Sequence, residues 1–508
     1  MSAMSRYKKS RDQWKVKAVS RADISRYLKK ELARVKKQRD KLKQENRQLQ
    51  AQLDSVNEPV MISKCDLVWI ALQLFCLARI GFRAVSRVLA VLAGQLGIAK
   101  APCPQTIINW VTRLSITRIQ QAANALDAVR AGGWLWVIDA SIAMGASKIM
   151  TLLAIRADHY QHYGGGPTLQ TVHCIGVSVA LSWTGQSVAE LLQKAIAAVG
   201  RPLAIIKDGG TDLAKALRVL ADIGIDIIGI DDLSHVVANL LKHRYQNHHM
   251  FKTFMSTCGK ASKYFKQSIL ACLAPPKVST KARFMNLHRL VTWADRILRH
   301  SPTGRAANGS LVARLREGFD QLPQCKAFIA QFLRDASALL QCQSIIKANG
   351  LSVDTVEQCQ AEIQKIPQGS PVRNGISQWL EKHLQIARQL GLATIGMPAS
   401  SDIVEATFAT LKSLGAAPCK DANRLGMHVP AICGVLDKQD AQRVLTVTVA
   451  QQNQVVGNLN SLTRQRRQIL PNPGNLTESV LAAGENPTLL PGPKTGQKSH
   501  EIDNISDG

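Results

Sequence analysis

Three acidic residues that lie far apart in the chain have a setting that suits metal-dependent phosphodiester chemistry. Asp139 and Asp208 each end an apolar run of the strand type, and Glu405 lies on a predicted helix far downstream. Carboxylates that converge repel one another unless a divalent cation neutralises them, and Mg²⁺ prefers such oxygen ligands. Two ions about 3.5–4 Å apart can activate an attacking hydroxyl and stabilise the leaving oxygen. These three residues are therefore candidate metal ligands and catalytic groups.

Each of these assignments has a plainer alternative. An aspartate at the end of a strand is more often a turn former or a helix cap than a ligand, so the order of the two aspartates is the stronger signal. Glu405 has rivals by composition only, none of which has its Ser-Asp-apolar-apolar-Glu setting. These rivals are Glu317, Glu357, Glu362 and Glu381.

The segments around the acidic residues predict an α/β fold with a mixed sheet. Apolar runs come in the order three strands, helix, strand, helix, strand, helix. Helices are expected to cover the faces of such a sheet. The predicted strands cover residues 134–140, 148–155, 169–183, 203–207 and 225–230, and the predicted helices cover 186–199 or begin near 211 and 234.

Four segments resemble the DDE-type transposases of insertion sequences, which have a ribonuclease H-like core. They are VIDAS around Asp139, IIKDGGTDLAKAL around Asp208, IDDLSHVVANLLK, and SSDIVEATFATLKS around Glu405. The resemblance covers roughly residues 130–430. It implies that Asp139 bridges two Mg²⁺ or Mn²⁺ ions, and that Asp208 and Glu405 each hold one of them.

The resemblance also implies auxiliary residues. Lys412 shares a helix face with Glu405 and would contact the phosphates of the element's ends. Asp232 and His235 would help to position DNA or a metal-bound water. The alternative for this pair is local: Asp232 or Ser234 caps the next helix and His235 packs nearby.

Residues 244–396 have helical periodicity and are expected to form an all-helical insertion in the catalytic domain, as is common in this family. The insertion is rich in Lys, Arg and His, for which we expect phosphate contact more than a solvated helix face. Trp293 could stack on a flipped base, although core packing is the more common role of a lone Trp. No His, Cys or carboxylate spacing indicates zinc.

The charge balance indicates a polyanionic partner. Lys and Arg number 64 against 36 Asp and Glu, a formal net charge of +28, and nucleic acid is the usual partner of such a surplus. Residues 65–118 predict three helices, over 66–78, 82–96 and 104–114, in a helix-turn-helix-like arrangement. The last would present four base-reading side chains on one face, unless it belongs to an ordinary bundle. These are Gln105, Asn109, Thr112 and Arg113.

A basic arm and a heptad repeat precede these helices. Leu28, Val35, Leu42 and Leu49 recur every seven residues, and Asn46 on the same seam would favour a two-stranded register. We expect a parallel coiled coil, and hence a homodimer or higher oligomer. A single solvated basic helix is the alternative.

The predicted organisation has seven parts. They are a basic arm (1–22), a coiled coil (23–58), a helical DNA-binding domain (63–125), two parts of a catalytic domain (130–243 and 397–450) around the insertion (244–396), and a polar, disordered tail (451–508). No apolar run is long enough to span a bilayer, and eleven scattered cysteines without a C-x-x-C pair fit reduced thiols. We expect a cytoplasmic, nucleoid-associated protein of the bacterial type.

The sequence therefore predicts a DNA transposase that binds the terminal inverted repeats of its element, cuts them and joins them to target DNA. Two alternatives stay open. One is a non-catalytic DNA-binding regulator, and the other is a ribonuclease H-like endonuclease that cuts without joining.

Overall fold

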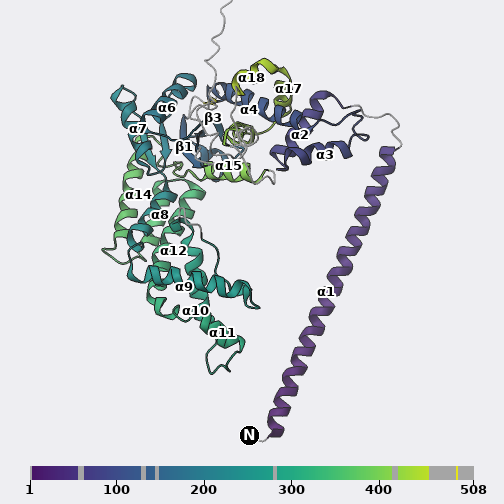
Figure 1. The fold of residues 1–508 in the computed structure, drawn as a ribbon, viewed down its shortest axis with the longest axis vertical. Helices are drawn as coiled ribbons and strands as arrows, with labels where there is room; N and C mark the ends of the chain where they lie inside the picture. Colours follow the sequence, from purple (N-terminus) through teal and green to yellow (C-terminus); the bar gives the residue numbers. More distant parts are fainter. Residues whose placement is uncertain are drawn as a thin grey trace, which may run out of the picture. The chain divides into compact units, whose positions relative to one another are not determined.

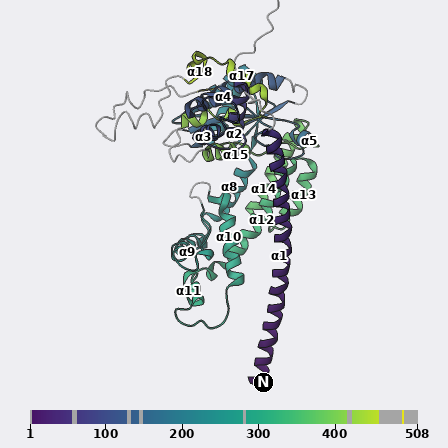
Figure 2. The same ribbon diagram turned by 90° about the vertical axis from the view of Figure 1, so that its right-hand side faces the viewer.

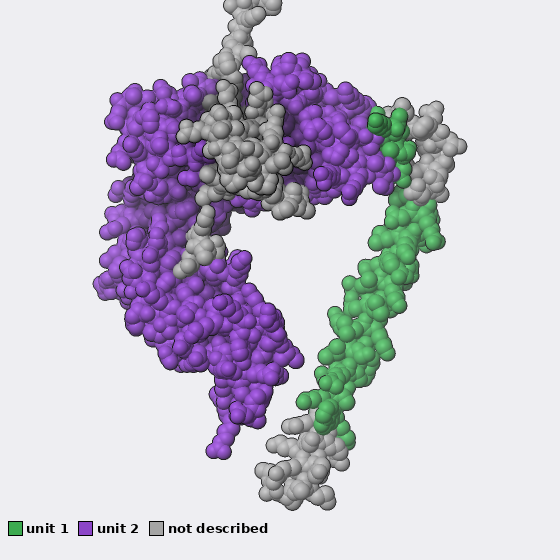
Figure 3. Space-filling model, in the orientation of Figure 1, with its two compact units in different colours: residues 1–62, 92–100 green, residues 63–91, 101–508 purple. Residues whose placement is uncertain are grey.

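The computed structural model describes residues 3–54, 62–127, 133–142, 148–278, 283–414, 422–456 and 488–489. The chain divides into two compact units (Figure 3). Unit 1 comprises residues 1–62 and 92–100, and unit 2 comprises residues 63–91 and 101–508.

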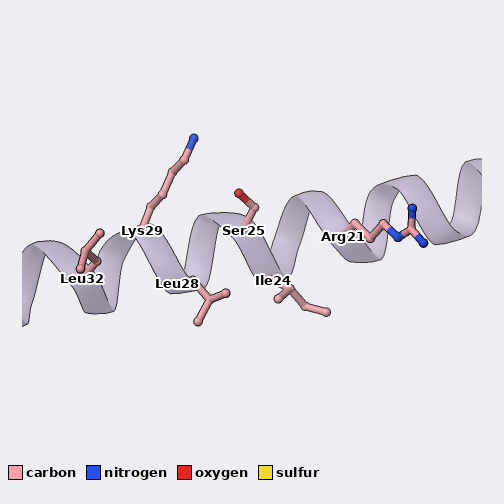
Figure 4. Close-up of a pocket in the computed structure, with 6 residues that line it drawn as sticks. All are labelled: Arg21, Ile24, Ser25, Leu28, Lys29 and Leu32. Carbon is pink, nitrogen blue, oxygen red and sulfur yellow. The ribbon is translucent and has the colours of Figure 1, made fainter. Parts of the chain in front are cut away.

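Unit 1 is dominated by one long helix, α1 (Ala3–Asp54). The helix runs without a break through the predicted basic arm and the heptad repeat, so the arm is not a separate segment. Its heptad side chains are exposed: Leu28, Val35, Leu42 and Leu49 keep 53–59% of their surface. A close-up of the helix shows Ile24 and Leu28 on one side and Ser25 and Lys29 on the other (Figure 4).

Unit 2 is built around a mixed β-sheet, which makes the protein a mixed α/β fold. Among the described residues the strand order is β5-β4-β1-β2-β3-β6. β1 pairs antiparallel with β2 and parallel with β4, and β4 pairs parallel with β5. The strands are β1 (Trp134–Ile142), β2 (Lys148–Arg156), β3 (His173–Ala180), β4 (Ala204–Lys207), β5 (Ile228–Asp231) and β6 (Thr488–Leu489).

The two faces of the sheet have different covers. Successive side chains of a strand point to opposite faces, and Trp134, Trp136 and Ile138 of β1 join the core that includes α6 (Gly185–Val199) and α7 (Thr211–Asp222). Leu135, Val137 and Asp139 therefore face the other side. There α15 (Asp402–Ser413) contacts β1, and α16 (Ala422–Gly426) contacts β2 and β3.

A long run of helices separates β5 from α15 in the chain and extends away from the sheet (Figures 1 and 2). Within the described part of the predicted insertion, residues 244–396, the regular elements are helices, and the one β contact recorded there is an isolated bridge between Leu351 and Met397. Its helices are α8 (Leu233–Tyr245), α9 (His249–Lys266), η1 (Ala271–Leu273), α10 (Arg283–His300), α11 (Leu311–Gly318), η2 (Pro323–Cys325), α12 (Lys326–Asn349), α13 (Val353–Ile363) and α14 (Pro371–Gln389).

The helices before the sheet pack with helices from the C-terminal part of the chain. α17 contacts both α2 and α4, and η3 contacts α4. The Arg118 guanidinium of α4 lies 2.8 Å from the Asp440 carboxylate of α17, and both side chains are almost fully buried. The predicted domain over 63–125 is thus not self-contained. These helices are α2 (Lys64–Cys76), α3 (Phe82–Val91), α4 (Pro104–Asp127), η3 (Pro430–Ile432), α17 (Lys438–Thr446) and α18 (Val449–Val456).

Several predicted boundaries need correction. The strand expected over 169–183 is limited to β3, the helix expected over 82–96 ends at Val91, and the helix expected over 104–114 continues to Asp127. The tail expected to be disordered includes the end of α18 and the two residues of β6, which pair with β3; the rest of it lies outside the described residues. None of the helices in the described ranges is both long and apolar enough to span a bilayer.

Candidate active site

Asp139 and Asp208 are neighbours because their strands are neighbours. In the parallel pair of β1 and β4, Ile138 lies opposite Lys207, so the aspartates that follow them are adjacent. Asp208 Oδ1 accepts a hydrogen bond from the Gly210 amide at 2.9 Å. A Cβ at position 210 would lie only 2.7 Å from that oxygen, which explains the glycine.

Glu405 approaches from the helix that covers this face. α15 contacts β1, and Glu405 lies in its first turn. The buried side of the helix packs into the core through Val404, Phe408 and Leu411, and Glu405 itself is exposed. The structure thus brings Asp139, Asp208 and Glu405 into one neighbourhood, where the parallel pairing of β1 with β4 ends. Asp208 follows β4 directly, but Asp139 does not end its strand as expected, because β1 continues to Ile142 in its pairing with β2.

The electrostatics of Asp139 reflect this neighbourhood. Burial first, and then the negative charge of Asp208, raise its pKa from 3.8 to about 7, and Glu405 adds to the rise. The Ala140 amide, which donates to Asp139 Oδ1 at 2.6 Å, opposes it. Partial desolvation and the charge of Asp402 likewise raise the pKa of Glu405. The site therefore carries negative charge that its own residues do not fully neutralise.

The residues present fit a hard divalent cation by their chemistry. Adjacent carboxylates such as Asp139 and Asp208 repel each other, and an oxygen-binding divalent cation such as Mg²⁺ or Mn²⁺ would relieve that repulsion. As they stand, no three His, Cys, Asp or Glu side chains of the described residues are grouped closely enough to hold one ion together. One oxygen each of Asp139 and Asp208 is instead bonded to a backbone amide.

Asp232 connects the two helices that flank the site. Its Oδ2 accepts from the His235 backbone amide at 2.8 Å and caps α8, and its Oδ1 accepts from the Ser401 amide at 2.6 Å, immediately before α15. The side chain is fully buried. The cap alternative for Asp232 is therefore confirmed, and the same carboxylate also fixes the start of the Glu405 helix.

His235 is both packed locally and turned into the site. Its Nδ1 lies 2.7 Å from Asp232 Oδ2. That hydrogen bond raises the pKa of His235 to about 9, and the nearby charges of Asp139 and Asp208 contribute. The positive charge of the protonated imidazole in turn lowers the pKa of Asp139.

Asp402 ties the start of α15 to the helical insertion. Its carboxylate accepts from the Ser234 hydroxyl at 2.7 Å and pairs with Lys347 at the end of α12. The Gln343 amide of α12 donates to Ser234 Oγ at 2.7 Å. No local sequence pattern identifies Lys347 or Gln343, because both approach the site from a helix that is distant in the chain.

A second group of charged residues, which no sequence pattern predicted, lies beside the site. Lys207, next to Asp208, pairs with Asp231 at 2.7 Å, and Lys382 of α14 pairs with the other oxygen of Asp231 at 2.8 Å. Together these charges lower the pKa of Asp231 to about 2 against its partial burial. The buried His383 accepts from the Asp231 amide at 3.0 Å through Nε2, and burial lowers its pKa to about 4. Through Lys382 and His383, the insertion therefore contacts and stabilises the ends of β4 and β5.

The predicted base-reading face of α4 is only partly available. Thr112 is buried at 5% exposure and its hydroxyl donates to the Ile108 carbonyl, which corrects the expectation that it faces DNA. α4 is packed on more sides than an isolated recognition helix, by α3, α17 and β3 among others. Gln105 is exposed. Asn109 and Arg113 are half-buried and hydrogen-bonded to Gln452 of α18, at 3.1 and 2.8 Å.

The two remaining predicted DNA contacts, Trp293 and Lys412, lie on different helices. Trp293 donates from Nε1 to the Leu273 carbonyl at 3.2 Å and its ring meets Phe319 edge-on, so it packs within the insertion, as the plainer alternative expects. Lys412 is exposed on the same helix as Glu405, with its ammonium 5.9 Å from the centre of the Phe408 ring.

Comparison of the whole chain with protein-family models gave no match, and comparison with curated proteins likewise gave none.

Proposed function

We propose that this protein is a DDE-type DNA transposase with a ribonuclease H-like catalytic core. The observation that carries the proposal is the adjacency of Asp139 and Asp208 where the parallel pairing of β1 with β4 ends, with Glu405 close enough to help raise the pKa of Asp139. The mixed sheet, the Glu-bearing helix on the Asp139 face and the resemblance of four segments support the same core.

In this proposal Asp139, Asp208 and Glu405 would hold two Mg²⁺ or Mn²⁺ ions. When bound, such ions activate the attacking hydroxyl or water and stabilise the leaving oxygen of the phosphodiester. Asp139 needs to lose its proton to serve as a ligand. Asp232 fixes the helix of Glu405, and the charged His235 offsets part of the repulsion among the carboxylates before any cation is present.

The remaining partners are proposed on the same basis. Duplex DNA, as the element's terminal inverted repeats and as target, is favoured by the net charge of +28. Gln105, Asn109 and Arg113 of α4 and Lys412 of α15 are the proposed contacts, with Gln452 of α18 displaced from Asn109 and Arg113. A homodimer would form through the exposed heptad side chains of α1. Such a protein would act at the nucleoid of a bacterial-type cytoplasm.

A strand-transfer assay tests the proposal. Labelled duplexes with the ends of the element that carries the gene are incubated with Mg²⁺ and a plasmid target, using the wild type, Asp139→Asn and Glu405→Gln. The matched control is Asp226→Asn, an exposed carboxylate just before β5, at the opposite end of the strand from Asp231.

We expect joined products from the wild type and the control, and a loss of at least about a hundredfold from either active-site variant, because each removes a charge that the reacting phosphate depends on. Cleavage without joining would favour the endonuclease. Binding without any cleavage, unchanged in Asp139→Asn, would favour the regulator and would contradict the proposal.

A further inference from the structure

Half of the protein's charge surplus is concentrated in one part of the helical insertion. Residues 242–316, which we call the basic lobe, contain fifteen Lys and Arg residues and a single acidic residue, Asp295. That is a net charge of +14 out of +28. By contrast, α12 to α14, residues 326–389, contain seven basic and five acidic residues. The surplus is therefore local and not a general property of the insertion.

The Lys and Arg side chains of the basic lobe whose exposure the structure describes are exposed. In α9 the buried side is apolar, with Phe251, Phe254 and Phe265 at 5% exposure or less. The basic residues occupy the opposite side of this helix, within an arc of roughly 120° at 100° per residue. They are Lys252, Lys260, Lys263 and Lys266, all exposed.

α10 repeats this arrangement, and few acidic groups oppose it. Arg289, Arg296 and Arg299 are exposed while Leu287, Leu290 and Val291 are buried. Asp295 pairs with Arg299 at 2.8 Å. Beyond the lobe, Glu317 accepts a hydrogen bond from the Tyr264 hydroxyl, and Asp320 follows it in the chain. Each of the two helices thus presents a cationic side that the nearby acidic residues do not offset.

α12 sets the distance between this surface and the carboxylates. Its C-terminal end reaches the site, where Lys347 pairs with Asp402. Its N-terminal end packs against the basic lobe, where the ring of Phe328 is 5.4 Å from the ring of Phe254 in α9. Figures 1 and 2 both show α9, α10 and α11 at the end of the insertion away from the sheet. The 24 residues of α12 span about 36 Å at 1.5 Å per residue.

We propose that the basic lobe is a second DNA-binding surface, which contacts the backbone of the reacting duplex about one helical turn from the carboxylates. A turn of B-DNA is also about 34–36 Å long, so a duplex that follows α12 from the site would present the same side to the lobe. Lysine and arginine side chains on such a surface would contact phosphates, which carry no sequence information, so the contact is independent of sequence. The position along the reacting duplex rests on the proposed function; the binding surface does not.

Binding to a duplex of arbitrary sequence tests the surface alone. Fluorescence anisotropy with a mixed-sequence 40-base-pair duplex measures the affinity of the full chain between 50 and 200 mM salt. The test variant carries Lys260→Gln, Lys263→Gln and Lys266→Gln. The control carries Lys194→Gln, Arg201→Gln and Arg218→Gln, which remove the same charge from exposed positions in and beside α6 and α7.

Each phosphate contact contributes about 0.9 to the slope of log affinity against log salt. We expect the test variant to lose about 2–3 from the magnitude of that slope, and the control to lose less than about 1. Equal losses in the two variants would overturn the proposal, since they would mean that charge acts diffusely. Retained duplex binding in the test variant, with lost binding to phosphatidylserine vesicles, would also overturn it and indicate a membrane partner. Thermal melts of both variants that match the melt of the wild type would exclude misfolding as the cause of a loss.

Hydroxyl-radical footprinting on an element-end duplex tests the position. The wild type should protect backbone about 10–11 base pairs from the cleaved phosphate, and the test variant should lose only that protection. If neither the wild type nor the variants cleave DNA but the salt slopes differ as expected, the transposase proposal is contradicted and the proposed DNA-binding surface is supported. Protection lost elsewhere, or nowhere, would refute the position one turn from the site.

Discussion

At the scale of single residues, the carboxyl group of Asp139 is both a proposed metal ligand and a source of pH-dependent stability. Its pKa of about 7 lies well above the ordinary 3.8, so between these values the folded protein holds a proton that the unfolded chain releases. The free energy of unfolding therefore falls as pH rises through this window. Below pH 3.8 both states are protonated and the effect vanishes.

Asp139→Asn should for this reason stabilise the protein while abolishing activity. We expect a gain on the order of 2–4 kcal/mol at pH 8 without divalent cations, and almost none at pH 4. Thermal or urea unfolding at the two pH values, with Asp226→Asn as the control, measures it. Added Mg²⁺ should reduce the difference in the free energy of unfolding between Asp139→Asn and the wild type, because it would stabilise only the wild type. A pH-independent difference would mean that the Asp139 charge is already neutralised.

Residue types and spacing identified the acidic residues, but they could not identify what supports those residues. Asp208 was predictable because an aspartate after a buried strand has a local pattern. Lys347 and His383 have none: each meets the site from a helix more than a hundred residues downstream of Asp208. Thr112 was misplaced because the sequence spacing assigns a side chain to a face of a helix, but not the number of faces that neighbours cover.

At the scale of elements, strand positions followed from apolar runs, and the parallel pairing of β1 with β4 follows from an intervening helical crossover. Helix ends were less accurate, because tertiary packing extends α4 beyond the point where its periodicity weakens. α1 is the opposite case. Its pattern predicts a partner, and within this one chain the apolar side chains of the pattern remain exposed.

Charges placed in the heptad positions of α1 should separate the proposed dimer. Val35→Lys combined with Leu42→Lys replaces burial worth about 1.5–3 kcal/mol per side chain with two buried ammonium groups. Ala33→Lys combined with Gln44→Lys adds the same charge outside the heptad stripe. We expect sedimentation of the full chain to give dimers for the wild type and the control, and monomers for the heptad variant. A monomeric wild type at tens of micromolar would contradict the coiled coil.

At the scale of the whole molecule, the parts nearest in space are not the parts nearest in sequence. The helices before the sheet pack against α17, from the C-terminal part of the chain. Arg118 holds this junction. It pairs with Asp440 and donates to backbone carbonyls of residues 431–435. Domain limits read along the sequence could not include such a contact, because it joins residues more than three hundred positions apart.

Arg118→Ala should accordingly destabilise the protein by about 3–5 kcal/mol, since it leaves the buried Asp440 carboxylate without its main partner. Arg443 lies 3.3 Å from the same carboxylate but is partly exposed, and Arg443→Ala should cost no more than about 1 kcal/mol. Chemical denaturation of the full chain compares the two. Limited proteolysis should cut the first variant early, between residues 431 and 437. Equal stabilities would show that the junction does not depend on this ion pair.

The double hydrogen bonding of Asp232, to α8 on one side and to the start of α15 on the other, has a consequence for synthesis on the ribosome. About 200 residues separate Asp208 from Glu405, and translation at roughly 5–20 residues per second takes about 10–40 s to cover them. During that time a nascent chain has both aspartates but no glutamate, and one Asp232 oxygen still lacks the Ser401 amide. Competence to cut DNA would thus arise late, only when the chain is nearly complete.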